Sequence, residues 1–151
     1  MDIPHNALVI VADGRKLLLL RNKGDTSQID LRTEDWEDQP DPKNREIHSD
    51  APGTQQQSYG YGRPALDEPD YHQQNEDRFA AHIADRLNHM ALAGKVQDLA
   101  VIAPARTMGV LRQHWHKEAQ KRIICEITKE MIDRPTPDIE ALLIGAAHPP
   151  S

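Results

Sequence analysis

The chain has few of the residues that build cross-linked, aromatic or membrane-spanning structures. Its 151 residues include one cysteine and one phenylalanine, and aromatic residues make up only 4% of the sequence. A single cysteine excludes an internal disulfide, and the apolar stretch around Cys125 favours a small buried thiol over a reactive nucleophile. With so few aromatic side chains, the core must be mainly aliphatic.

The sequence also predicts neither a targeting segment nor a membrane-spanning segment. The N-terminus has no basic region followed by an apolar region, so it predicts no signal peptide. No stretch approaches the roughly 18–20 apolar residues that span a bilayer. We therefore expect a cytoplasmic protein without a membrane partner. The length is typical of one domain, and we treat residues 1–151 as a single domain.

A long polar segment, residues 36–75, interrupts this domain. Only 8 of its 40 residues are hydrophobic, yet it holds all three tyrosines and 5 of the 11 prolines. It also carries eight carboxylates against three Lys or Arg, which is most of the net charge of −6. An irregular loop of this length is uncommon inside a small domain and is often functional. The remainder is nearly neutral, which leaves room only for a local basic patch for nucleic acid.

Three short strands are expected before this insertion. Aliphatic runs at Asn6–Asp13 and Arg15–Arg21 flank an Asp13-Gly14 turn, which is a strong hairpin signal because glycine tolerates a positive φ. Ser27–Glu34 alternates apolar and polar residues, as a half-buried third strand does.

Helices and strands alternate after the insertion. One helix, capped by Asn75 and with Glu76 and Asp77 favourable to its dipole, is expected to end at Gly94. Apolar runs predict two buried strands, and polar residues mark the starts of two further helices. The strands cover Asp98–Ala103 and Arg122–Ile127, and the helices begin at Thr107 and at Thr136 or Pro137.

This order of elements predicts an α/β fold with a mixed five-stranded sheet in the order 3-2-1-4-5. Three meandering strands followed by two right-handed crossovers give this ribonuclease H-like arrangement, with helices on the faces of the sheet. A doubly wound nucleotide-binding fold is disfavoured, because no glycine-rich phosphate loop follows the first strand.

Four short motifs occur in order along the chain: Val11-Ala-Asp-Gly14, Ser49-Asp-Ala-Pro-Gly53, Arg78-Phe-Ala-Ala-His-Ile-Ala-Asp-Arg-Leu87 and Ile102-Ala-Pro-Ala-Arg-Thr-Met-Gly-Val-Leu-Arg112. Taken together, they resemble the bacterial host-attachment protein family, described as required for attachment to host cells. The resemblance covers roughly residues 5 to 144. Its departures are mild: Ala105 stands where a second proline is common, and residues 129–131 read Lys-Glu-Met in place of Lys-Asp-Leu.

That family is in turn similar to the middle, catalytic domain of archaeal and eukaryotic peptide-chain release factors. The fold implied by the resemblance agrees with the strand order above. In release factors, a Gly-Gly-Gln loop at the position of the insertion enters the peptidyl-transferase centre of the ribosome. The matching stretch here is Pro52-Gly-Thr-Gln-Gln-Gln-Ser-Tyr-Gly-Tyr-Gly62, which lacks that tripeptide. Hydrolysis of peptidyl-tRNA is therefore not carried over.

The insertion provides the first candidate binding site. Glutamine amides both donate and accept hydrogen bonds, tyrosine rings offer stacking faces, and glycines allow close approach of the backbone. Such a tip could contact RNA, a ribosome or a protein; alternatively it has no dedicated ligand or is ordered only by self-association. The candidate residues are Gly53, Gln55, Gln56, Gln57, Tyr59, Tyr61 and Arg63.

A second candidate is an anion or phosphate site formed by Arg106, Thr107 and Arg112. Free N–H groups at a helix start attract anions, and the two arginines could add charge. The alternative is that Thr107 only caps the helix and that the basic residues form a solvated face.

A metal-dependent nuclease site of the ribonuclease H type is a weaker hypothesis. Its carboxylates would be Asp13, Glu76, Asp77 and Asp98, which could bridge two metal ions. The turn, the helix dipole and a strand start account for these residues equally well. The histidines lack metal-ligand spacing, and no Ser-His-Asp pattern or Gly-x-Ser-x-Gly elbow is present.

The leading hypothesis is a non-enzymatic binding protein that has no catalytic residue, metal or cofactor. It would engage a ribosome or structured RNA through residues 50–75, assisted by the Arg106–Arg112 patch. The alternatives are a metal-dependent RNA-processing enzyme and a self-associating structural protein that forms a homo-oligomer.

Overall fold

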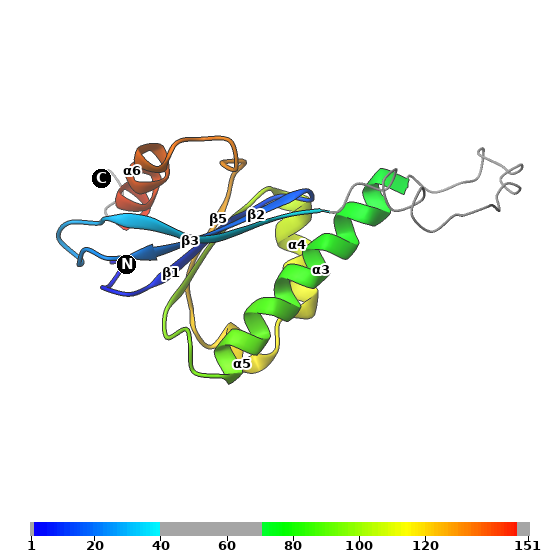
Figure 1. The fold of residues 1–151 in the computed structure, drawn as a ribbon, viewed down its shortest axis with the longest axis horizontal. Helices are drawn as coiled ribbons and strands as arrows, with labels where there is room; N and C mark the ends of the chain where they lie inside the picture. The colour runs from blue at the N-terminus through cyan, green and yellow to red at the C-terminus, as the bar shows by residue number, and fades with distance from the viewer. Residues whose placement is uncertain (1, 40–70, 148–151) are drawn as a thin grey trace, which may run out of the picture.

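Residues 2–39 and 71–147 are described by a computed structural model, in which helices cover both faces of a five-stranded sheet (Figure 1). The sheet order is β3-β2-β1-β4-β5, so the predicted ribonuclease H-like order is confirmed. The strands are β1 (Leu8–Ala12), β2 (Lys16–Asn22), β3 (Leu31–Asp38), β4 (Leu99–Ala103) and β5 (Ile123–Thr128). The helices are α3 (Tyr71–Leu92), α4 (Ala105–His114), α5 (Lys117–Gln120) and α6 (Thr136–Ala147).

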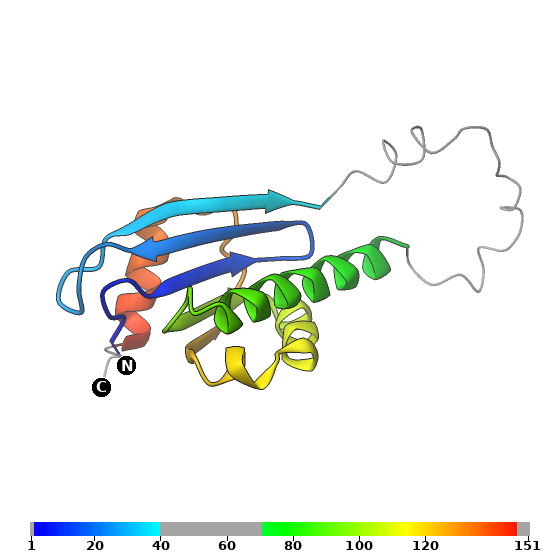
Figure 2. The ribbon, with the colours of Figure 1, turned by 60° about the horizontal axis from the view of Figure 1, so that its bottom comes forward.

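The core consists of two apolar layers separated by the sheet. Helices α3, α4 and α5 lie on one face and α6 on the other (Figures 1 and 2). Strand β1 is antiparallel to β2 and parallel to β4, and all five of its residues are buried. Leu8 and Ile10 pack in the layer beneath α3 and α4, whereas Val9 and Val11 pack in the layer beneath α6. A strand buried on both faces explains the continuous aliphatic run in the sequence.

The limits of the insertion differ from those expected. Strand β3 runs from Leu31 to Asp38, later than the predicted Ser27–Glu34, because the carboxylate of Asp25 accepts hydrogen bonds from the backbone of Ser27 and Gln28 and holds a turn there. Helix α3 begins at Tyr71, one turn before the predicted cap at Asn75. Residues 36–38 and 71–75 are therefore strand and helix, and the insertion proper is shorter than predicted.

Helix α4 begins before the predicted start at Thr107. The helix begins at Ala105 after Pro104, and no side chain caps it, so Thr107 is not the N-cap and is only 7% exposed. Pro104 is the N-cap: its backbone is extended and its carbonyl accepts the first helical hydrogen bond, from the N–H of Met108 at 2.8 Å, so its missing N–H costs the helix nothing. The helix stops at His114, and α5 is separate, because Asn88 of α3 binds the backbone of both His114 and His116.

The structure also shows how α3 ends and how far Cys125 is buried. Gly94 does end α3: its φ is +74°, and Gly94 and Lys95 donate to the carbonyls of Ala91 and Met90 in a Schellman arrangement. Cys125, by contrast, is half-buried rather than fully buried, because it lies on the edge strand β5. Burial still raises the pKa of its thiol.

The predicted hairpin is present, but its glycine serves a different purpose. The carboxylate of Asp13 accepts hydrogen bonds from the backbone N–H groups of Arg15 and Lys16, both at 2.8 Å, and Gly14 does not have a positive φ. A Cβ atom at Gly14 would instead lie 2.4 Å from Cβ of Glu76 on α3. Glycine is needed because the helix crosses the turn with no room for a side chain.

Gly14→Ala is expected to lower the free energy of unfolding by about 1–3 kcal/mol, because the helix must shift to admit one methyl group. Urea denaturation at neutral pH measures this change. The matched control is Gly109→Ala, where a Cβ meets nothing within 4 Å inside α4. That change should raise stability by up to about 1 kcal/mol. Equal effects at both positions would contradict the packing argument.

Candidate functional site at the base of the insertion

The insertion leaves and rejoins the described chain at one end of the sheet (Figures 1 and 2). Asp38, the last residue of β3, pairs with Lys16 beside the β1–β2 turn. The carboxyl ends of the parallel strands β1 and β4 lie at the same end, next to the start of α4. In open α/β sheets, ligands bind outside the carboxyl ends of the strands. This end of the sheet is therefore the natural place for a site.

The β1–β2 turn holds both ends of the insertion. On the side of β3, Gln39 donates its backbone N–H to the carbonyl of Arg15 at 2.7 Å and its amide to the carbonyl of Gly14 at 2.9 Å. On the side of α3, Glu76 packs over Gly14 and forms an ion pair with Arg15 at 3.5 Å. One short turn thus fixes the strand end and the helix start together.

A cluster of charged side chains joins β3 to α3 beneath this base. Glu37 accepts from Arg86 at 2.8 Å and lies 2.5 Å from the ring nitrogen of His82, while Arg86 also binds Asp35. The guanidinium of Arg86, together with the backbone N–H of Trp36, holds the pKa of Asp35 below its usual value. The cluster keeps the last half of an edge strand attached to the helix.

A cavity of about 250 Å³ opens between the end of β3 and the first half of α3. Phe79 is only 5% exposed and forms an aromatic floor, with the ring of His82 6.0 Å away. The remaining walls are polar, so the cavity presents charged and amide groups above an apolar base. Its lining residues are Glu37, Asp38, Gln39, Asn75, Arg78, Phe79 and His82.

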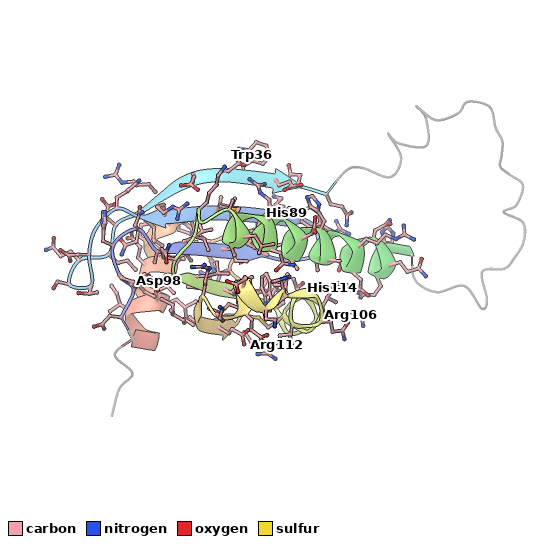
Figure 3. All side chains as sticks on the ribbon, turned by 90° about the horizontal axis from the view of Figure 1, so that it is seen from below. Trp36, His89, Asp98, Arg106, Arg112 and His114 are labelled. Carbon is pink, nitrogen blue, oxygen red and sulfur yellow. The ribbon has the colours of Figure 1, made fainter. Side chains whose placement is uncertain are left out.

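The residues of the predicted loop site, Gly53 to Arg63, lie outside the described residues. The predicted anion site is only partly assembled: Arg106 forms an ion pair with Asp77 at 3.1 Å, and Arg112 forms one with Glu126 of β5 at 2.7 Å. Figure 3 shows both arginines on α4. Thr107 is buried. The hydrogen bond from Arg106 lowers the pKa of Asp77. Both arginines therefore already have a carboxylate partner within the chain.

The four carboxylates of the nuclease hypothesis are not gathered at one point. Asp13 binds the backbone of its own turn, Glu76 pairs with Arg15, and Asp77 pairs with Arg106. Asp98 precedes β4 at the opposite end of the sheet (Figure 3). Within residues 2–39 and 71–147, no group of three or more His, Cys, Asp or Glu could hold a metal ion.

The model of the bacterial archaeo-eukaryotic release factor family 12 matches residues 6–143 of this sequence. The chain belongs to this family. Among solved structures, it is similar to an archaeal translation termination factor at 9% sequence identity and a TM-score of 0.45. That similarity covers 93% of this chain, which spans 41% of the termination factor. No curated protein matches.

Family membership confirms the predicted relation to release factors but not the host-attachment name, which stays a prediction. The family match begins near β1 and ends within α6. It therefore includes the β1–β2 turn, β3 and α3, which hold the two ends of the insertion. In the described part of the chain, no helix has the length and apolar character needed to cross a membrane.

Sequence reasoning missed the charged cluster and the cavity. Two sequence patterns point to the cluster. Asp35 and Glu37 are two residues apart, so they share one face of a strand, and Arg78, His82 and Arg86 recur every four residues, so they share one face of a helix. Each pattern alone is typical of a solvated face. Only the pairing of β3 with α3 shows that the two faces meet.

Arg86→Met is expected to lower the free energy of unfolding at pH 7 by about 1 kcal/mol, since two partly exposed ion pairs are lost. Because the pKa of Asp35 is lowered in the folded state, its stabilising contribution is present above pH about 4 and is lost as the pH falls through the folded-state pKa. The difference between variant and wild type should therefore shrink at pH 3.

Urea midpoints at pH 7 and pH 3 measure both effects. Arg134→Met is the control, because it removes an exposed pair with Asp138 far from the cluster. A loss for Arg86→Met that stays constant with pH would show that the ion pairs are not its cause.

Proposed function

We propose that this release factor family member is a non-enzymatic binding protein that engages the ribosome or a structured, translation-related RNA through its insertion. The observation that carries the proposal is the family match across residues 6–143, which includes the insertion and the elements that anchor it. The anchoring contacts support it further. The β1–β2 turn and the β3–α3 cluster hold the two ends of the insertion on a packed frame, which is how binding loops are usually presented.

The chemistry of the insertion fits recognition of nucleic acid. Consecutive glutamines offer amides that can bind base edges or ribose, and tyrosines offer faces for unstacked bases. Arg63 adds a cation within a segment that is acidic overall. The residues proposed to contact the partner are Gly53, Gln55, Gln56, Gln57, Tyr59, Tyr61 and Arg63.

Binding is favoured over hydrolysis for two reasons. The sequence lacks the Gly-Gly-Gln tripeptide on which the release-factor resemblance would base peptidyl-tRNA hydrolysis. Three of the four carboxylates considered for metal catalysis bind the turn backbone or arginines, and Asp98 lies at the opposite end of the sheet. A ribosomal partner would place the protein in the cytoplasm, and the attachment-related name would then describe a phenotype rather than adhesion by this chain.

Removal of residues 51–66 is expected to reduce the fraction of protein that co-sediments with ribosomes at least tenfold, because the contact residues are lost. Gln55→Ala, Gln56→Ala and Gln57→Ala combined should give a smaller loss without shortening the chain. Gly145→Ala, a change in α6 on the other face of the sheet where a Cβ meets nothing within 4 Å, is the control and should sediment like the wild type.

Equal co-sedimentation of the intact and shortened chains would show that the insertion does not bind the ribosome. Sedimentation velocity of the same two proteins tests self-association. A dimer that becomes a monomer on shortening, with no ribosome binding by either chain, would favour the homo-oligomer instead.

The intact protein is expected to release no peptide from peptidyl-tRNA and to cleave no RNA in the presence of Mg²⁺ or Mn²⁺. Product formation over an hour, measured against a no-protein control, checks this. Metal-dependent cleavage that disappears when Asp13→Asn and Glu76→Gln are combined would restore the nuclease hypothesis.

A further inference from the structure

Helices α4 and α5 form an exposed ridge that is rich in basic residues. Between residues 106 and 122 the chain has five Lys or Arg and two His but only one acid, Glu118. Figure 3 shows Arg106, Arg112 and His114 on α4, next to α5. The protein as a whole has a net charge of −6, so this ridge is a local reversal of sign.

Most of the paired bases of the ridge are more exposed than the acids that pair with them; Arg122, 23% exposed beside Glu118 at 31%, is the exception. Arg106, Arg112 and Lys121 have side chains that are 63%, 56% and 65% exposed. Their partners Asp77, Glu126 and Glu118 are only 36%, 27% and 31% exposed. Lys117 is exposed and, among the described residues, has no ion-pair partner. A ligand that approaches the ridge therefore meets cations first.

The ridge is also held on a firm frame. The amide of Asn88 donates to the carbonyl of His114 at 2.9 Å and accepts from the N–H of His116 at 2.8 Å, which fixes the corner between α4 and α5. The ring of His116 then caps α5 by accepting from the N–H of Glu118 at 3.0 Å. The basic residues on both helices thus keep a defined spacing.

The ridge lacks the apolar anchor that protein partners usually require. Large exposed hydrophobic side chains in the described chain are Trp36, Leu92 and Ile144, and none of them belongs to α4 or α5. Protein interfaces generally depend on buried aromatic or aliphatic anchors at their centre, whereas contacts to a nucleic-acid backbone use Lys and Arg without sequence information. The composition favours a polyanion with regularly spaced charges.

We propose that the α4–α5 ridge binds the phosphate backbone of RNA, with Arg112, Lys117 and Lys121 as the main contacts. This inference rests on the proposed function, because it names a second contact to the same partner. The insertion would recognise the partner's exposed groups, and the ridge would bind its backbone without regard to sequence.

The test measures binding of the full chain to a fluorescent oligouridylate of about 20 nucleotides, by fluorescence anisotropy at several salt concentrations. Combining Arg112→Glu, Lys117→Glu and Lys121→Glu should weaken binding more than tenfold. It should also reduce the slope of log K against log salt by about 2, since each phosphate contact on a single strand contributes about 0.7. The control combines Lys23→Glu, Lys129→Glu and Arg134→Glu, which give the same net charge, and it should stay within a few-fold of wild type.

Lys117→Gln with Lys121→Gln is a milder second variant that keeps the Arg112–Glu126 pair and should lower the slope by about 1.4. An unchanged affinity and slope in both variants would overturn the proposal. So would an equal loss in the charge-matched control, or equally tight binding of polyglutamate that is lost in the same variants.

The chain without residues 51–66 separates this inference from the proposed function. It should still bind oligouridylate with the full salt slope, even where it no longer co-sediments with ribosomes. Loss of oligouridylate binding in that chain would assign the contact to the insertion and overturn the role of the ridge.

Discussion

The close approach of α3 to the β1–β2 turn is the constraint on which the arrangement of this protein depends. Glu76 lies over Gly14 with no space for a side chain between them, and the same turn binds Gln39 just beyond β3. Both ends of the insertion are consequently fixed by two residues of a hairpin turn, Gly14 and Arg15. If the helix shifted along the sheet, the pairing of Arg86 and His82 with β3 and the support for α4 would shift with it.

Charge is distributed over this frame in a way that separates two kinds of surface. Asp35 and Glu37 of β3 are matched by bases on α3, so these charges of the edge strand have partners within the chain. Along α4 and α5, Arg106, Arg112 and Lys121 are more exposed than the acids that pair with them. The first arrangement stabilises the fold and discourages edge pairing, whereas the second leaves positive charge available to a ligand. An overall charge of −6 conceals this difference.

The strand order could be predicted because it depends on features that are local or topological: aliphatic runs, a turn at Asp13-Gly14 and the right-handed crossover rule. The errors occurred where tertiary contacts override local preference. Strand β3 was placed too early because its charged second half looks like loop until Arg86 and His82 are seen beside it. The sequence predicts Thr107 as a cap, yet Pro104 is the N-cap of α4 and Thr107 is buried. The charged cluster and the cavity could not be predicted, since neither sequence periodicity indicates its partner.

The sequence by itself determined the composition of the core, the order of the elements, the position of a polar insertion and the absence of the Gly-Gly-Gln tripeptide, because these depend on residue type and spacing along the chain. The tertiary structure alone decided which carboxylates are already paired, which glycine is required for packing and which basic residues face outward. These properties depend on distances between segments far apart in the sequence, and a contact such as Gly14 with Glu76 has no local signature.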